Sequence, residues 1–170
     1  MMERRSALAL NPVKAIAFPL LLGCAIAAPL LGNQFVTGTI VNATLFIATA
    51  MFGVSYGMMI AIIPSAFALA VGLLPSVLAP MIPFIIFGNA VLIVIFGGWK
   101  KEGWYWPRMI AAGVVKFALI YSASLLVTKW IVNEAMAANV AVMMSWPQLV
   151  TAICGGILAF GILKLRKRSF

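Results

Sequence analysis

The stretch MIPFIIFGNAVLIVIF, residues 81–96, contains one polar side chain, Asn89. A helix rises about 1.5 Å per residue, so this run is long enough to cross the hydrocarbon core of a membrane. Pro80 and Pro83 fall in the first turn of such a helix, where a proline is tolerated because the first backbone N–H groups have no partner within the helix. The stretch predicts a membrane-spanning helix that begins at these prolines. Asn89 then lies near mid-bilayer and should face the inside of a bundle, where an amide can find a partner.

The composition agrees with an integral membrane protein. Hydrophobic residues make up 65% of the 170 residues, charged residues make up 9%, and the mean hydropathy is +1.14. These values leave too little polar surface to close a water-soluble globule of this size. The formal net charge of +9 is interpreted as a topology signal, and no nucleic-acid partner is expected.

The residue types exclude several kinds of catalytic and metal site. The chain has three Glu, two Cys, no His and no Asp. Triads that need His, aspartyl dyads and the usual zinc, di-iron or iron–sulfur ligand sets are therefore excluded, and we expect no metal and no cofactor. An intramembrane enzyme would have to use Ser122 or Ser124 with Lys116 or Lys129. Ser122 and Lys129 are two helical turns apart, about 10 Å, which is too far for direct proton transfer.

Six apolar stretches fit membrane spans and form one membrane domain over residues 1–170. The expected spans are about 15–31, 39–53, 58–74, 81–97, 109–132 and 146–163, with a basic arm over 1–14 and a basic tail over 164–170. Polar turns are expected over 32–38 and 53–57, and a link over 133–140. Pro64 should bend or break the third span unless neighbouring groups bond the freed carbonyl. The predicted fold class is all-α, a bundle of six transmembrane helices.

The positive charges indicate the orientation of this bundle. Six spans place ten of the twelve basic residues on one face, namely Arg4, Arg5, Lys14, Lys100, Lys101, Arg108, Lys164, Arg166, Lys167 and Arg168. Cytoplasmic loops carry an excess of Lys and Arg, so both termini are expected in the cytoplasm.

Polar residues in the outer half of the bundle are the candidates for binding a ligand from outside. Asn33 and Gln34 lie in the first outer turn, Asn42 begins the second span, and Gln148 begins the last. We hypothesise that Asn42, Asn89 and Gln148 donate and accept hydrogen bonds to a bound small molecule, with Phe84 and Trp146 as aromatic contacts. The alternative is that these amides bond helix to helix, with no ligand.

Two lysines inside the fifth span have two interpretations each. Ser122, Lys129 and Asn133 occupy one helical stripe, so Lys129 can bind a carboxylate or phosphate if the stripe faces inward. The alternative is a lysine that snorkels to the interface beside Trp130. Lys116, about 12 Å deeper than Arg108, is expected to snorkel to the cytoplasm, and the alternative is a contact with a partner subunit or an acceptor within the membrane.

Small residues spaced by four mark one face of the first span. Gly23 with Ala27, and Cys24 with Ala28, allow a close neighbouring helix, either from this bundle or from a partner. The basic start and the sequence LLGC also resemble a lipoprotein signal with Cys24 as the lipid acceptor. We expect an uncleaved helix.

Two stretches carry a resemblance to a known family. Residues 41–92, VNATLFIATAMFGVSYGMMIAIIPSAFALAVGLLPSVLAPMIPFIIFGNAVL, and WPQLVTAICGG at 146–156 resemble the substrate-binding S component of energy-coupling factor (ECF) transporters, in a branch without an assigned substrate. The most distinctive pieces are Asn42-Ala43, LAPMIPFIIFGN at 78–89, and Gln148-Leu149. The resemblance extends over nearly the whole chain, and none of its motifs is a catalytic signature.

The resemblance implies a mechanism and partners. An S component captures a vitamin or other micronutrient in its outer half. It then topples in the bacterial or archaeal cytoplasmic membrane while bound to a transmembrane coupling subunit and two cytoplasmic ATPases. The chain has no GxxxxGK[ST] loop, so ATP hydrolysis would come from partners. Family members dock through an alanine pair on the first helix, for which Gly23 with Ala27 and Cys24 with Ala28 are the nearest equivalents. A small channel or passive transporter without ATPases is the alternative.

Overall fold

The computed structural model describes residues 12–72, 76–98, 103–130 and 134–168. These ranges form helices and short connections, with no strand among them. The helices are α1 (Pro12–Ala27), α2 (Gln34–Phe52), α3 (Val54–Ala70), α4 (Ile82–Gly98), α5 (Tyr105–Val127), α6 (Glu134–Met143) and α7 (Trp146–Arg168), with the 3₁₀ helices η2 (Ala28–Leu31), η3 (Ser76–Met81) and η4 (Thr128–Trp130). The arm over 1–11, the loop residues Lys100 and Lys101, and Asn133 lie outside the described residues.

The fold is a helical membrane bundle. Within the described ranges, four helical segments are long and apolar enough to cross a membrane, namely Gln34–Phe52, Leu78–Gly98, Tyr105–Trp130 and Glu134–Arg166. Two shorter apolar helices, Ala15–Leu31 and Val54–Ala70, accompany them. The all-α, multi-pass character expected from the sequence is therefore confirmed.

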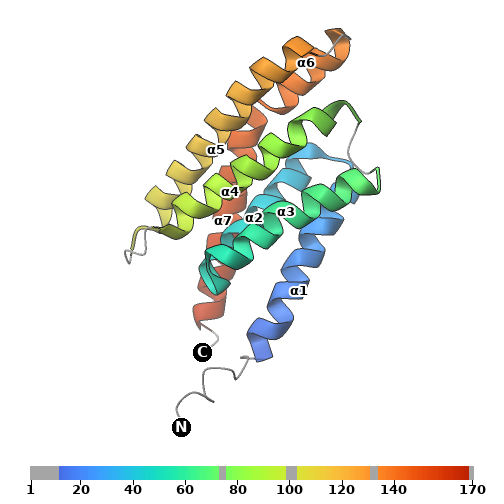
Figure 1. Cartoon of the computed structure of the whole chain (residues 1–170). Coiled ribbons are helices and arrows are strands. Elements are labelled where there is room, and N and C mark those ends of the chain that lie inside the picture. Colours follow the sequence, from blue (N-terminus) through green and yellow to red (C-terminus); the bar gives the residue numbers. More distant parts are fainter. Residues whose placement is uncertain (1–11, 73–75, 99–102, 131–133, 169–170) are drawn as a thin grey trace, which may run out of the picture.

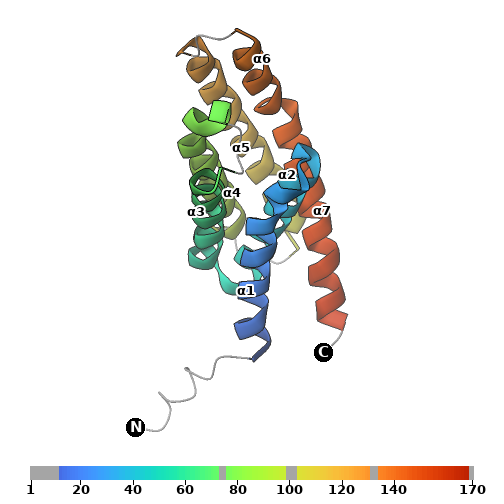
Figure 2. The ribbon, with the colours of Figure 1, turned by 90° about the vertical axis from the view of Figure 1, so that its right-hand side faces the viewer.

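Helices α1 to α5 run alternately up and down between two ends, and α6 continues into α7 in one direction (Figures 1 and 2). The beginning of α1 and the end of α7 lie at one end, which we call the terminal end, and α6 lies at the opposite, distal end. Helix α2 packs most extensively against α7 and also contacts α1, α3 and α4, while α5 packs against α4 and α7. The central position of α2 explains why its residues 42–49 are all buried.

The first two predicted turns are wrong because helices begin earlier than expected. The turn over 32–38 shrinks to Gly32 and Asn33, since the Asn33 side chain accepts hydrogen bonds from the backbone N–H groups of Phe35 and Val36 and starts α2 at once. The turn over 53–57 is a single residue, Gly53, whose φ of 97° is a conformation that favours glycine.

Other boundaries also differ from the prediction. Helix α3 continues as one α-helix through Pro64, so the proline does not break it. The expected link over 133–140 is largely helix α6. The expected basic tail continues α7 as far as Arg168. Helical structure therefore extends beyond the apolar stretches, into segments that the sequence predicted as a link and a tail.

Glycines allow α2 and α7 to approach closely. A Cβ atom on Gly155 of α7 would lie 2.7 Å from Asn42 Cβ and 2.8 Å from the backbone nitrogen of Ala43. A Cβ on Gly38 of α2 would lie 2.9 Å from the Thr151 side chain on α7. This close approach brings Asn42 and Thr151, on two different helices, within hydrogen-bonding distance of each other.

Candidate functional site

A cavity of about 290 Å³ lies between the helices in the distal half of the bundle. Its walls come from α1 and η2, the first part of α2, the last part of α3, η3 and α4, the middle of α5, and the junction of α6 with α7. The polar residues that line it are Asn33, Gln34, Thr37, Asn42, Ser65, Asn89, Lys116, Gln148 and Thr151. The volume is close to the lower limit for small-molecule sites, about 300 Å³.

A chain of hydrogen bonds centred on Asn42 connects three helices at this cavity. The Lys116 Nζ atom on α5 donates to Asn42 Oδ1 at 2.6 Å. Asn42 Nδ2 donates to the Gly38 carbonyl oxygen at 2.8 Å and to Thr151 Oγ1 on α7 at 3.4 Å. Both Asn42 and Lys116 are buried. The amide therefore positions the lysine amine, and α7 positions the amide.

Lys116 does not snorkel to the cytoplasm, so that prediction is wrong. The side chain is 3% exposed and lies inside the bundle, in contact with the cavity. Its stem passes Gly88 of α4, where an added Cβ would lie 3.5 Å from Lys116 Cγ. The other interpretation offered by the sequence, an acceptor within the membrane, is correct, and Asn42 is that acceptor.

Two glutamines at the distal end of the cavity bind the end of α6. Gln34 Nε2 at the start of α2 donates to the carbonyl oxygen of Met143, and Gln148 Nε2 in the first turn of α7 donates to the same oxygen at 3.2 Å. The last carbonyl groups of a helix have no partner within it, and Met143 is the last residue of α6. Both side chains therefore fasten α6 over the cavity.

The first connection forms another part of this distal wall. Asn33 Oδ1 caps α2 through the N–H groups of Phe35 and Val36, at 2.9 and 3.2 Å. Thr37 Oγ1 donates to the Ala28 carbonyl oxygen at 2.9 Å. Asn33 and Thr37 thus bond the backbone of the protein even though both line the cavity.

Asn89 differs from the other amides at the cavity. It is 2% exposed, on the inward face of α4 as the sequence predicted, and it lines the cavity. Its Oδ1 atom is buried and has no hydrogen-bond partner among the described residues. A buried acceptor without a donor is costly, and Asn89 belongs to the cavity wall, so a donor group of a solute that reached this oxygen would be favourable.

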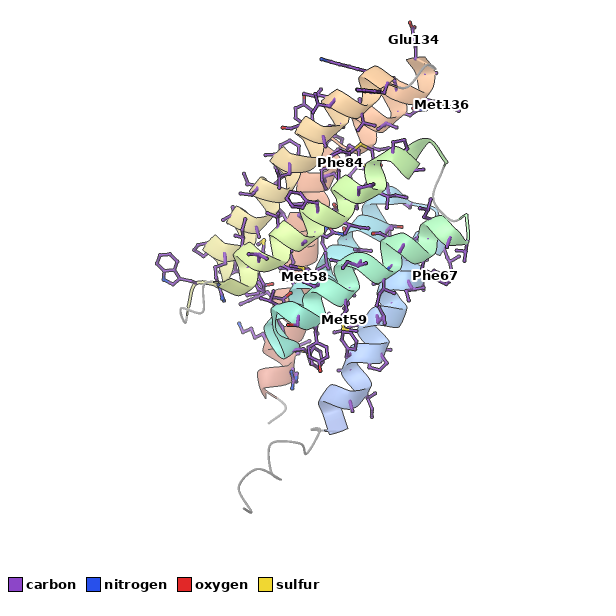
Figure 3. All side chains as sticks on the ribbon, in the orientation of Figure 1. Met58, Met59, Phe67, Phe84, Glu134 and Met136 are labelled. Carbon is purple, nitrogen blue, oxygen red and sulfur yellow. The ribbon has the colours of Figure 1, made fainter. Side chains whose placement is uncertain are left out.

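Four of the predicted site residues do not line the cavity. Phe84 on α4 is 40% exposed (Figure 3). The residues of α4 that line the cavity are Ile82, Ile85 and Asn89, which the helical period places on another side of the helix. Trp146 is 58% exposed and packs on Phe35 with ring centroids 5.5 Å apart.

Ser122 and Lys129 are the other two, and both are exposed. Their stripe faces outward because the buried face of α5 follows a different set, namely Met109, Ala112, Gly113, Lys116, Ile120, Ala123 and Ser124. Lys129 lies in η4 beside the exposed Trp130, as the snorkelling interpretation requires. The small and apolar residues spaced by three and four around Lys116 were the sequence signal for its burial.

The terminal half of the bundle is filled. Phe46 of α2 packs edge-on against Phe96 of α4 with ring centroids 4.8 Å apart, and Phe96 packs against Tyr105 of α5 at 5.3 Å. Tyr105 packs in turn on Phe160 of α7, and its hydroxyl donates to the Gly156 carbonyl oxygen at 2.7 Å. These rings fill the bundle between the cavity and the terminal end, and none of them lines the cavity itself.

No family model, no curated protein and no solved structure matches the chain.

The predicted docking face on α1 is divided between surface and interior. Gly23, Cys24 and Ala27 are exposed, and a Cβ on Gly23 would meet nothing within 4 Å. Ala28 is buried, and its carbonyl accepts the bond from Thr37. Gly23 and Ala27 thus form an open strip on the outside of the bundle, whereas Ala28 packs within it.

Proposed function

We propose that this protein is the substrate-binding S component of an ECF-type importer. In this proposal it captures a vitamin or other micronutrient in the distal cavity and delivers it with a transmembrane coupling subunit and two cytoplasmic ATPases. The bundle crosses the membrane six times with both termini in the cytoplasm. The protein itself performs no chemistry on the solute.

One observation supports capture most directly, namely a cavity that holds a buried acceptor without a donor. Four amide side chains at the cavity bond the protein itself, but Asn89 Oδ1 has no partner among the described residues. Binding sites commonly combine apolar walls with a few fixed polar groups, and this cavity has both. A bound solute with an N–H or O–H group would satisfy Asn89.

The filled terminal half favours capture over a passive channel. A channel needs a continuous polar path, but between the cavity and the terminal end lies an apolar core cluster that includes Phe46, Leu92 and Phe96. The buried hydroxyls of Thr44 and Thr49 in this region donate to backbone carbonyls of α2 itself. A solute that enters the distal cavity therefore has no open route onward. Its release would require movement of helices or of the whole bundle, which is the role of an ATP-driven partner.

Charge supports the orientation. Arg108 at the beginning of α5 and Lys164 and Arg166 near the end of α7 lie at the terminal end, while Lys129 lies at the distal end. The positive-inside rule then places the terminal end in the cytoplasm and the cavity toward the exterior. The open strip of Gly23 and Ala27 on α1 is the surface that we assign to the coupling subunit.

The test is reconstitution with and without the ATP-driven partners. The purified chain is analysed by native mass spectrometry for a co-purified small molecule, and that molecule is then offered to liposomes that hold the chain alone or the chain with a coupling subunit and two ATPases. We expect uptake only in the second set, and only with ATP. Uptake by the chain alone would assign the protein to the passive transporters.

A further inference from the structure

We propose that the captured solute is a water-soluble organic anion, a carboxylate or phosphate ester, whose charge is bound by Lys116. This inference rests on the proposed function and names the class of solute for the same cavity. It comes from the charge balance around one buried lysine, which the fold alone does not explain.

Lys116 has a hydrogen-bond acceptor but no counter-charge among the described residues. Asn42 Oδ1 accepts one of its N–H groups, and a lysine ammonium has three to donate. Glu134 is the one acidic residue in the described ranges, and it is exposed at the tip of α6 (Figure 3). A buried cation is costly unless an anion pairs with it, so a carboxylate or phosphate at the cavity would stabilise Lys116 strongly.

The surroundings of the lysine hold it toward the cavity. The Gly88 position leaves room for the stem to cross α4, and Ile120 packs at the same glycine one turn further along α5. Asn42 is itself fixed by Gly38 and Thr151, so the amine has little freedom to reach the membrane surface. Lysine is therefore placed as a fixed amine in a low-dielectric site, where a bound anion would favour its charged form and a charge-assisted hydrogen bond is strongest.

Asn89 adds a second requirement for the solute. It follows Gly88 on α4, so its acceptor oxygen lies on the same helix segment that the lysine stem crosses. Much of the remaining cavity wall is apolar, including Val41, Ile82 and Ile85. The solute class is thus a small anion with an apolar body and one N–H or O–H donor.

Fractionation of a mixed solute pool by charge tests this class before the solute itself is identified. The lipid-free small-molecule fraction of yeast extract is separated on an anion-exchange resin at neutral pH, and each fraction is added to the purified full chain. Molecules that are released when the purified chain is unfolded are separated on the same resin and classed as retained, and so anionic, or as unretained. The measurement is the melting temperature, which rises when a ligand binds the folded state.

We expect the retained, anionic fraction to stabilise the wild-type protein, and the unretained fraction to have no effect. Lys116→Met should weaken apparent affinity for the active component by about 10- to 100-fold, the range for a hydrogen bond to a charged group. Lys129→Met is the matched control, since that lysine is exposed and away from the cavity, and it should behave like wild type. Lys116→Gln, which keeps a polar group, replaces the Met variant if the latter does not fold.

Each other outcome overturns a different statement. Equal stabilisation by the unretained fraction would overturn the anion assignment and leave solute capture intact. Stabilisation only by detergent micelles that contain phosphatidylglycerol, and not by detergent micelles that contain phosphatidylcholine, would assign the anion to a lipid headgroup and overturn a water-soluble solute. Full retention of affinity in both Lys116 variants would remove that residue from the site. Stabilisation by no fraction, with no released molecule, would contradict both the anion and the proposed capture.

Discussion

The terminal half of the bundle is filled by side chains, whereas the distal half surrounds a cavity. In the terminal half, rings from α2, α4, α5 and α7 fill the space between helices, and the polar groups found there bond to backbone carbonyls, as Tyr105 does with Gly156. In the distal half the same helices separate around a cavity lined by amides, hydroxyls and one amine. The same four helices therefore form a solid region and a hollow region along their length.

This difference separates the residues that stabilise the fold from the residues that can bind a solute. In a bilayer the gain from burying apolar groups is small, so close packing and satisfied polar groups hold helices together. The terminal half has the close packing, and the distal half retains an unpaired acceptor at Asn89 and an amine without a counter-charge among the described residues. Substitutions in the first half should alter unfolding, and those at the second should alter binding.

The largest expected effect comes from creating a cavity in the terminal half. Phe46 is fully buried, and Phe46→Ala should lower the free energy of unfolding by about 3 to 5 kcal/mol, the range for large-to-small core substitutions. Phe87→Ala, at a ring that is 58% exposed on α4, is the matched control and should cost far less. Denaturant unfolding of the purified proteins measures both. Equal losses would mean that the terminal half is not the stable part of the bundle.

The contact between α2 and α7 is tested by adding one methyl group. Gly155→Ala would place a Cβ 2.8 Å from backbone atoms of Ala43 and Thr39, which cannot move as a side-chain tip can. We expect a loss of about 1 to 3 kcal/mol of stability, together with weaker solute binding because Asn42 is displaced. Gly161→Ala on the same helix, where a Cβ meets nothing within 4 Å, should be neutral or slightly stabilising. Thermal melts that do not distinguish the two would contradict this packing.

The sequence predicted much of the solid framework and the inward direction of Asn89. Apolar runs and proline positions located six of the helices, since those signals are local. The turns were less predictable, because the capping bond from Asn33 and the single residue Gly53 continue helices into polar stretches. Lys116 was misassigned because a lone charge in an apolar span can also reach the membrane surface at little energetic cost. Its acceptor, Asn42, lies on α2, which the Lys116 side chain reaches from α5 only in the folded bundle.

The distal half is tested by removing its unpaired acceptor, Asn89 Oδ1. Asn89→Leu replaces an amide by an apolar group of similar size, so the unfolding free energy should stay equal or rise, because a buried unsatisfied oxygen is lost. Affinity for the solute identified by mass spectrometry should fall by about tenfold or more. Phe84→Leu on the outer side of α4 serves as the control. Unchanged affinity in Asn89→Leu would place the solute elsewhere.

The smallest expected effect separates the two roles that the sequence allowed for the outer amides. Asn33 lines the cavity, but its Oδ1 already accepts two backbone N–H groups of α2, so its contribution should be to the helix and not to the solute. Asn33→Ala should cost about 1 kcal/mol of stability, and Asn33→Asp, which keeps the capping oxygen, should restore it. Solute affinity should change little in the aspartate variant, because in both proteins the side-chain oxygen at position 33 caps α2 and is not used to bind the solute. A marked fall in affinity for Asn33→Asp with unchanged stability would instead show that position 33 contributes to binding, either through its amide nitrogen or through the absence of a negative charge beside an anionic solute. The solute site would then include the residues at the rim of the cavity.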